Sequence, residues 1–77
     1  MERYVIEERM KKEPFRPFHV VMSSGDRYEV RHPELAMVLK TRVIVALPSG
    51  NGDNVPDRTV DCAMDHITGI EDLQPAR

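Results

Sequence analysis

A β-hairpin is the feature that most constrains the fold of this chain. Residues 15–32, FRPFHVVMSSGDRYEVRH, predict one. Residues 17–22 are rich in apolar side chains. Residues 27–32 alternate between polar and apolar positions, as expected for a strand with one solvent-exposed face. Gly25 lies between them in the sequence SSGD and can adopt positive φ without steric cost. Because an isolated hairpin is only marginally stable in water, other segments must cover it.

The remaining segments predict one helix and three further strands. Lys11 follows Glu7 at the i, i+4 spacing that supports a helix, and Pro14 ends this helix. The predicted elements besides the hairpin strands are a helix at about residues 2–12, a short helix or 3₁₀ turn at 32–38, strands at about 42–47, 58–63 and 66–70, an exposed loop at 48–57 and a loose tail at 72–77. The helix has a poor apolar stripe, so it docks through a narrow seam or partly against a second subunit.

These elements predict an α+β fold. An N-terminal helix is followed by a small, strongly bent antiparallel sheet or a partly open barrel of about five strands. The helix-first order and the five-strand pattern are analogous to SH3-like and Sm-like barrels. This is an analogy of fold, which carries no function by itself.

Composition limits the class of protein. A chain of 77 residues forms one small domain, and 40% hydrophobic with 31% charged residues favours a thin core under a charged surface. The net charge of −2 shows no basic excess for nucleic acid or an anionic membrane. Cys62 is the single cysteine, which suits a reducing cytoplasm. We expect a cytoplasmic protein without a secretory signal or a membrane span.

The residues that most often carry chemistry do not form a recognisable site. The three histidines are His19, His32 and His66, and no two have HxH or HxxxH spacing. Cys62 lies inside a predicted strand, where a lone cysteine behaves as a small core hydrophobe. Carboxylates recur at Asp53, Asp57, Asp61 and Asp65, but the alternating ligands and closing Glu of a calcium loop are missing. We therefore expect no enzyme activity, no metal and no cofactor.

Basic side chains suggest a binding surface. Four arginines fall on neighbouring predicted strands, and a basic face on a small barrel can bind RNA or single strands. Nearby acidic residues such as Glu29 and Asp61 favour cross-strand ion pairs instead. The candidate binding surface consists of Arg27, Arg31, His32, Arg42, Arg58, Asn51 and Asp53.

Several motifs carry a family resemblance. PFRPF leads into the first strand, SGDRYEVRHPE covers the turn and second strand, and DHITGIE covers the last predicted strand. Over residues 14–71 the chain resembles a family of small bacterial proteins of unknown function that carries PFRPF, a DGR-type turn, Y/F-x-V-x-HPE and H-I-T-x-I-E. The chain departs from it at residues 24–26, where Ser-Gly-Asp replaces Asp-Gly-Arg. The resemblance implies no assigned activity.

Two functions are weighed at this point. The preferred hypothesis is a non-enzymatic protein-interaction or regulatory module that presents a sheet edge and the loop at 48–57 to a protein partner, with a second copy of the chain as one candidate. The alternative is a small nucleic-acid-binding β-barrel that uses Arg27, Arg31 and Arg42.

Overall fold

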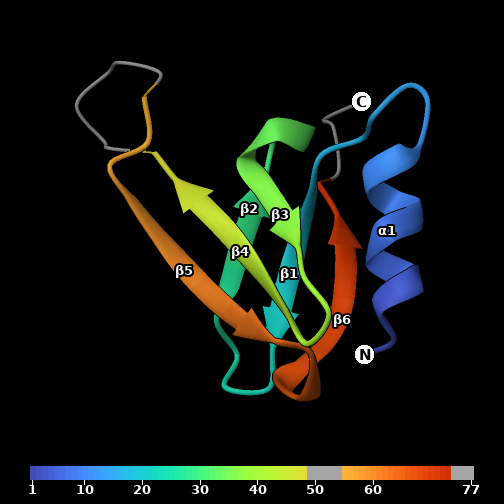
Figure 1. Cartoon of the computed structure of the whole chain (residues 1–77), viewed down its shortest axis with the longest axis vertical. Helices are drawn as coiled ribbons and strands as arrows, with labels where there is room; N and C mark the ends of the chain where they lie inside the picture. Colours follow the sequence, from blue (N-terminus) through green and yellow to red (C-terminus); the bar gives the residue numbers. More distant parts are fainter. Residues whose placement is uncertain (49–54, 74–77) are drawn as a thin grey trace.

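The fold combines one helix with two small sheets. The computed structural model describes residues 1–48 and 55–73. In chain order its elements are α1 (Arg3–Lys11), β1 (Phe18–Met22), β2 (Arg27–Val30), the 3₁₀ helix η1 (Pro33–Leu35), β3 (Ala36–Val38), β4 (Arg42–Leu47), β5 (Arg58–Ala63), the 3₁₀ helix η2 (Met64–His66) and β6 (Ile67–Asp72) (Figure 1). The strands form two antiparallel three-stranded sheets, β2–β1–β6 and β3–β4–β5. The predicted α+β class with an N-terminal helix is confirmed.

Three details of the prediction are wrong. The described residues contain six strands rather than about five, and they form two sheets that do not close into a barrel. Residues 36–38, predicted as helical, form β3, because Pro33 starts only one 3₁₀ turn and the backbone at Ala36 is already extended. The predicted tail begins too early, since Asp72 belongs to β6.

The predicted hairpin is formed by β1 and β2. Phe18 lies opposite Val30, and Val21 lies opposite Arg27. At the turn Gly25 has a φ of 96°, a value that costs a residue with a Cβ atom but not glycine. The register places Phe18 and Val30 together on the face that is buried.

The core lies between the two sheets and under the helix. Buried side chains come from every long element: Ile6, Phe18, Val20, Val30, Val43, Val45, Cys62, Met64 and Ile67. Ile6 is the buried residue of α1, and it is completely buried. Burial of such apolar surface is the main source of stability in a domain of this size.

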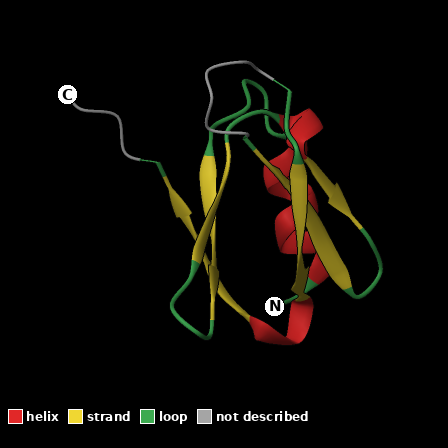
Figure 2. Cartoon of the chain, turned by 90° about the vertical axis from the view of Figure 1, so that its left-hand side faces the viewer, coloured by secondary structure: helices red, strands yellow, loops and turns green. Residues whose placement is uncertain are grey.

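The helix covers one side of the two sheets (Figure 2). Arg9 of α1 forms an ion pair with Asp72 of β6, and its guanidinium lies 5.0 Å from the ring centroid of Phe18. The helix also packs against β3. Because α1 lies beside β6 and β3, the other two edge strands, β2 and β5, are the ones that the helix leaves uncovered.

No helix in residues 1–48 and 55–73 has the length and apolar character needed to cross a bilayer.

Candidate functional site

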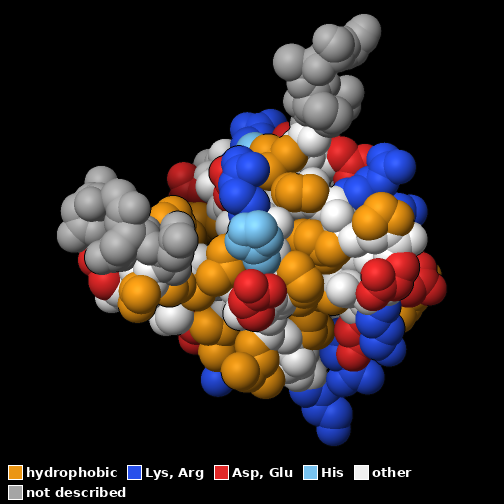
Figure 3. All heavy atoms as spheres, turned by 90° about the horizontal axis from the view of Figure 1, so that it is seen from above, with side chains coloured by type: hydrophobic (Ala, Val, Ile, Leu, Met, Phe, Trp, Pro, Cys, Tyr) orange, Lys and Arg blue, Asp and Glu red, His pale blue; other side chains and the backbone are white. Residues whose placement is uncertain are grey.

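A groove lies at one end of the molecule, where β2 and β4 end and β5 begins. Its volume is about 590 Å³, and the described residues that line it are Glu29, Arg31, His32, Glu34, Leu35, Leu47, Pro48 and Pro56. Seen from this end, hydrophobic side chains lie among basic, acidic and histidine side chains (Figure 3). The volume falls within the range of sites that bind ligands or peptide side chains.

Prolines and a short turn give the groove its walls. β2 ends at the buried Val30, and Pro33 then starts η1, in which the Leu35 N–H donates to the His32 carbonyl at 3.0 Å. Leu35, at the end of this turn, is half-buried and lines the groove. Leu47 and Pro48 at the end of β4 contribute to the lining. One wall is thus apolar, and its prolines offer no backbone N–H.

Glu29, from the edge strand β2, also lines the groove. The Met22 N–H donates to the Asp26 carbonyl at 2.8 Å, which fixes the pairing phase of the hairpin. Because hydrogen-bonded pairs alternate along an antiparallel ladder, Tyr28 and Val30 bond to β1. Glu29 therefore directs its N–H and C=O away from β1. Among the described residues, β2 pairs with no strand other than β1, so the outward backbone groups of this edge have no strand partner.

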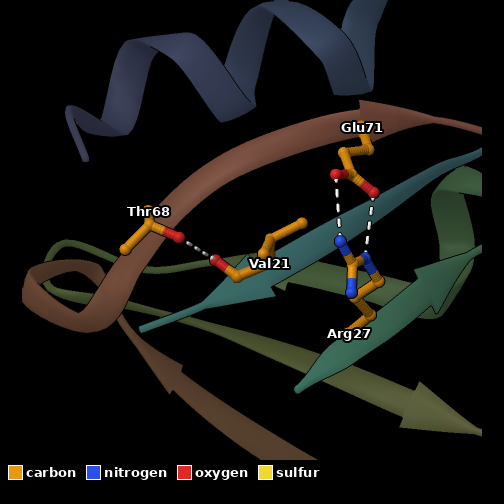
Figure 4. A network of polar contacts seen from close by, with 4 residues as sticks. All are labelled: Val21, Arg27, Thr68 and Glu71. Atoms are coloured by element: carbon orange, nitrogen blue, oxygen red, sulfur yellow. Dashed lines mark hydrogen bonds and ion pairs between the residues drawn. The ribbon is translucent and has the colours of Figure 1, made fainter. Parts of the chain in front are cut away.

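Two ion pairs lie near the groove and on the outer face of the β2–β1–β6 sheet. Within the groove, Arg31 forms an ion pair with Glu29. On the sheet face, the Arg27 guanidinium donates to both carboxylate oxygens of Glu71, at 3.0 and 3.2 Å, across the central strand (Figure 4). This hydrogen bonding holds the pKa of Glu71 below its usual value. Beside it, the Thr68 hydroxyl donates to the Val21 carbonyl at 3.3 Å.

The predicted arginine surface is not one patch. Arg27 lies in the β2–β1–β6 sheet, whereas Arg42 lies in the β3–β4–β5 sheet, 3.5 Å from a carboxylate oxygen of Asp61. Arg58 is exposed at the start of β5. Arg27 and Arg42 thus each have a carboxylate partner and lie in different sheets.

Of the predicted surface, the structure brings Arg31 and His32 together in the groove. Asn51 and Asp53 lie outside the described residues. Sequence reasoning missed the apolar lining of the groove. Pro48, directly after β4, and Pro56, shortly before β5, were the residues that could have indicated it.

Neither the histidines nor the thiol forms a reactive centre in the part of the chain that the structure describes. His19 lies on the open face of β1, with Glu29 and Glu71 as its neighbours in register. No group of three His, Cys, Asp or Glu side chains among the described residues is arranged to hold a metal ion. Cys62 is buried, and this burial, with the nearby Asp61, raises the pKa of its thiol. The thiol therefore has little tendency to form the nucleophilic thiolate.

Comparison with protein-family models, with curated proteins and with solved structures gives no match. The function is therefore argued from the geometry of the groove and of the strand edges.

Proposed function

We propose that this chain is a non-enzymatic protein-interaction module that binds an extended peptide segment of a partner in the end groove. The observation that carries the proposal is the unpaired backbone of Glu29, a residue of an edge strand that lines the groove together with Leu47 and Pro48. A peptide strand can add to such an edge through main-chain hydrogen bonds, while apolar recesses select its side chains.

The lining indicates which peptides fit. An aliphatic side chain of the peptide contacts Leu35, Leu47 and the neighbouring prolines, because this is the apolar part of the groove. Arg31 is already neutralised by Glu29. Glu34 has no ion pair among the described residues, so it favours a basic residue on the bound peptide. The preferred ligand is an extended segment with an aliphatic residue near a lysine or arginine.

The nucleic-acid alternative has less support. Arg27, Arg31 and Arg42 each have a carboxylate partner, and they are divided between two sheets. The analogy to SH3-like and Sm-like barrels rests on the order of the strands and does not favour either ligand.

A backbone variant with a matched side-chain control tests the proposal. Glu29→Pro removes the N–H that faces the groove, and an edge strand tolerates this change because the lost donor does not bond to β1. Glu29→Ala removes the same side chain but keeps the N–H. Aliphatic–basic peptides selected by display are then titrated into both variants by fluorescence anisotropy.

We expect Glu29→Pro to bind these peptides about two- to tenfold more weakly than Glu29→Ala, the equivalent of one backbone hydrogen bond. Far-UV circular dichroism checks that both variants are folded. Equal affinity of the two folded variants, or failure of any such peptide to bind wild type, contradicts the proposal.

A further inference from the structure

The edge of β5 is a second unpaired strand edge, separate from the groove wall formed by β2. The Met64 N–H donates to the Thr41 carbonyl at 2.9 Å, directly beyond the β4–β5 ladder. Since hydrogen-bonded pairs alternate, Cys62 and Val60 bond to β4. The residues that direct their N–H and C=O groups away from β4 are Thr59, Asp61 and Ala63.

This edge has little of the usual protection against strand pairing. Natural edge strands are shielded by proline, bulges, charged side chains (lysine above all) or a covering element, and the charged residues of β5 are Arg58 and Asp61. β5 contains no proline or lysine, and its register with β4 runs from Arg58 to Ala63 without a shift. Among the described elements, β4 alone packs extensively against β5. The exposed Asp61 carboxylate is matched by Arg42 of the same sheet, so it does not leave an unbalanced charge at the edge.

The positions of the charges select one register for pairing with a second copy. In a pair of β5 strands, residues whose backbone N–H and C=O groups point away from β4 must lie opposite such residues of the second copy. In a symmetric antiparallel pair this condition places the two-fold axis at one residue, which then lies opposite its own counterpart. Centring on Asp61 opposes two aspartates, centring on Thr59 opposes Asp61 to Asp57, and centring on Arg58 opposes two arginines. Centring on Val60 avoids all three conflicts and pairs Arg58 through Cys62 with the same residues of the second copy, which leaves only Ala63 of β5 opposite a residue outside the strand, Asp57.

We infer that two copies of this chain associate through antiparallel pairing of their β5 strands, centred on Val60. Thr59 then lies opposite Asp61 of the second copy, and its hydroxyl can donate to that carboxylate. Each of these pairs exchanges two backbone hydrogen bonds, and the two β3–β4–β5 sheets become one continuous sheet. Pairing of one strand buries little surface, so we expect a dimer that dissociates on dilution. The β2 edge stays free for the peptide of the proposed function.

Disulfide trapping tests the register. Val60→Cys is made in a Cys62→Ala background, so that it carries the only thiol. In the inferred dimer, residue 60 faces its counterpart in a non-hydrogen-bonded pair, with a Cα separation of about 4.5 Å, which a disulfide can bridge. The control is Thr59→Cys in the same background, because its two copies lie about 8 Å apart, beyond the reach of a disulfide.

We expect air oxidation at high protein concentration to give a covalent dimer of the Val60→Cys chain and none of the Thr59→Cys chain. The opposite pattern, or equal cross-linking of the two, overturns the register.

Sedimentation velocity over a concentration series tests the association itself, with no change to the core. We expect wild type to shift from monomer to dimer as the concentration rises. Thr59→Pro, which removes an outward N–H, should stay monomeric, while Thr59→Val, which keeps it, should still associate. A wild-type chain that stays monomeric at millimolar concentration, or a Thr59→Pro chain that dimerises like wild type, overturns the inference.

Discussion

Truncation of Ile6 is the sharpest test of how α1 is held. Ile6 is completely buried, whereas Tyr4 in the same helix is 60% exposed. Ile6→Ala removes three buried carbon groups and leaves a cavity, and such changes cost about 2–5 kcal/mol. The whole domain of 77 residues has roughly 4–11 kcal/mol of stability. The variant should therefore lose about a fifth of its stability or more.

Urea and thermal denaturation followed by circular dichroism measure this loss. A loss of about 3 kcal/mol lowers Tm by roughly 12–24 °C in a domain of this size. Ile6→Val should lose only about 0.5–1.5 kcal/mol, and Tyr4→Ala should stay within about 0.5 kcal/mol of wild type. If Ile6→Ala is as mild as Tyr4→Ala, α1 does not cover the core, and the packing described above is wrong.

Three other changes test single contacts. Because its contact with Arg27 lowers the pKa of Glu71 from the ordinary value of 4.5, the pair stabilises the fold above that pH, and the stability is lost as pH falls through the lowered pKa. Denaturation at several pH values should therefore show that wild type has a larger free energy of unfolding than Glu71→Gln at neutral pH and the same free energy of unfolding in acid. A difference in stability that persists in acid contradicts this. Gly25→Ala should lower the stability by about 1–2 kcal/mol because φ is 96°, although no atom within 4 Å obstructs a Cβ. Gly69→Ala, equally unobstructed, should leave the stability unchanged or raise it slightly. Equal effects of the two changes would contradict the turn geometry. The Cys62 thiol should react with a disulfide reagent only after denaturant is added, because burial raises its pKa; rapid labelling of the native protein would show that it is exposed.

Local patterns account for the parts of the fold that the sequence predicted. The hairpin is visible because Gly25 marks its turn and alternation marks its second strand, and the helix because Pro14 ends it. The sequence did not predict β3. Pro33 and Glu34 indicate the start of a helix, but they do not indicate whether that helix continues or ends after one turn, as it does at Leu35. The division into two sheets depends on which strands pair at long range, and periodicity along one strand does not contain that information.

The candidate site was only partly predictable for the same reason. Arg31 and His32 were named from the sequence, but other lining residues come from the end of β4 and the segment before β5, far away in the chain. The arginines were predicted to lie on neighbouring strands, but Arg27 and Arg42 belong to different sheets.

Amide hydrogen exchange at Glu29 tests the central claim most directly. In the free monomer, the Glu29 amide should exchange rapidly, because it faces the groove without a partner, while the neighbouring amides of Tyr28 and Val30 exchange slowly. Saturation with a selected aliphatic–basic peptide should then protect the Glu29 amide. A Glu29 amide that is already protected in the free protein, or that stays unprotected when the peptide is bound, would contradict the account.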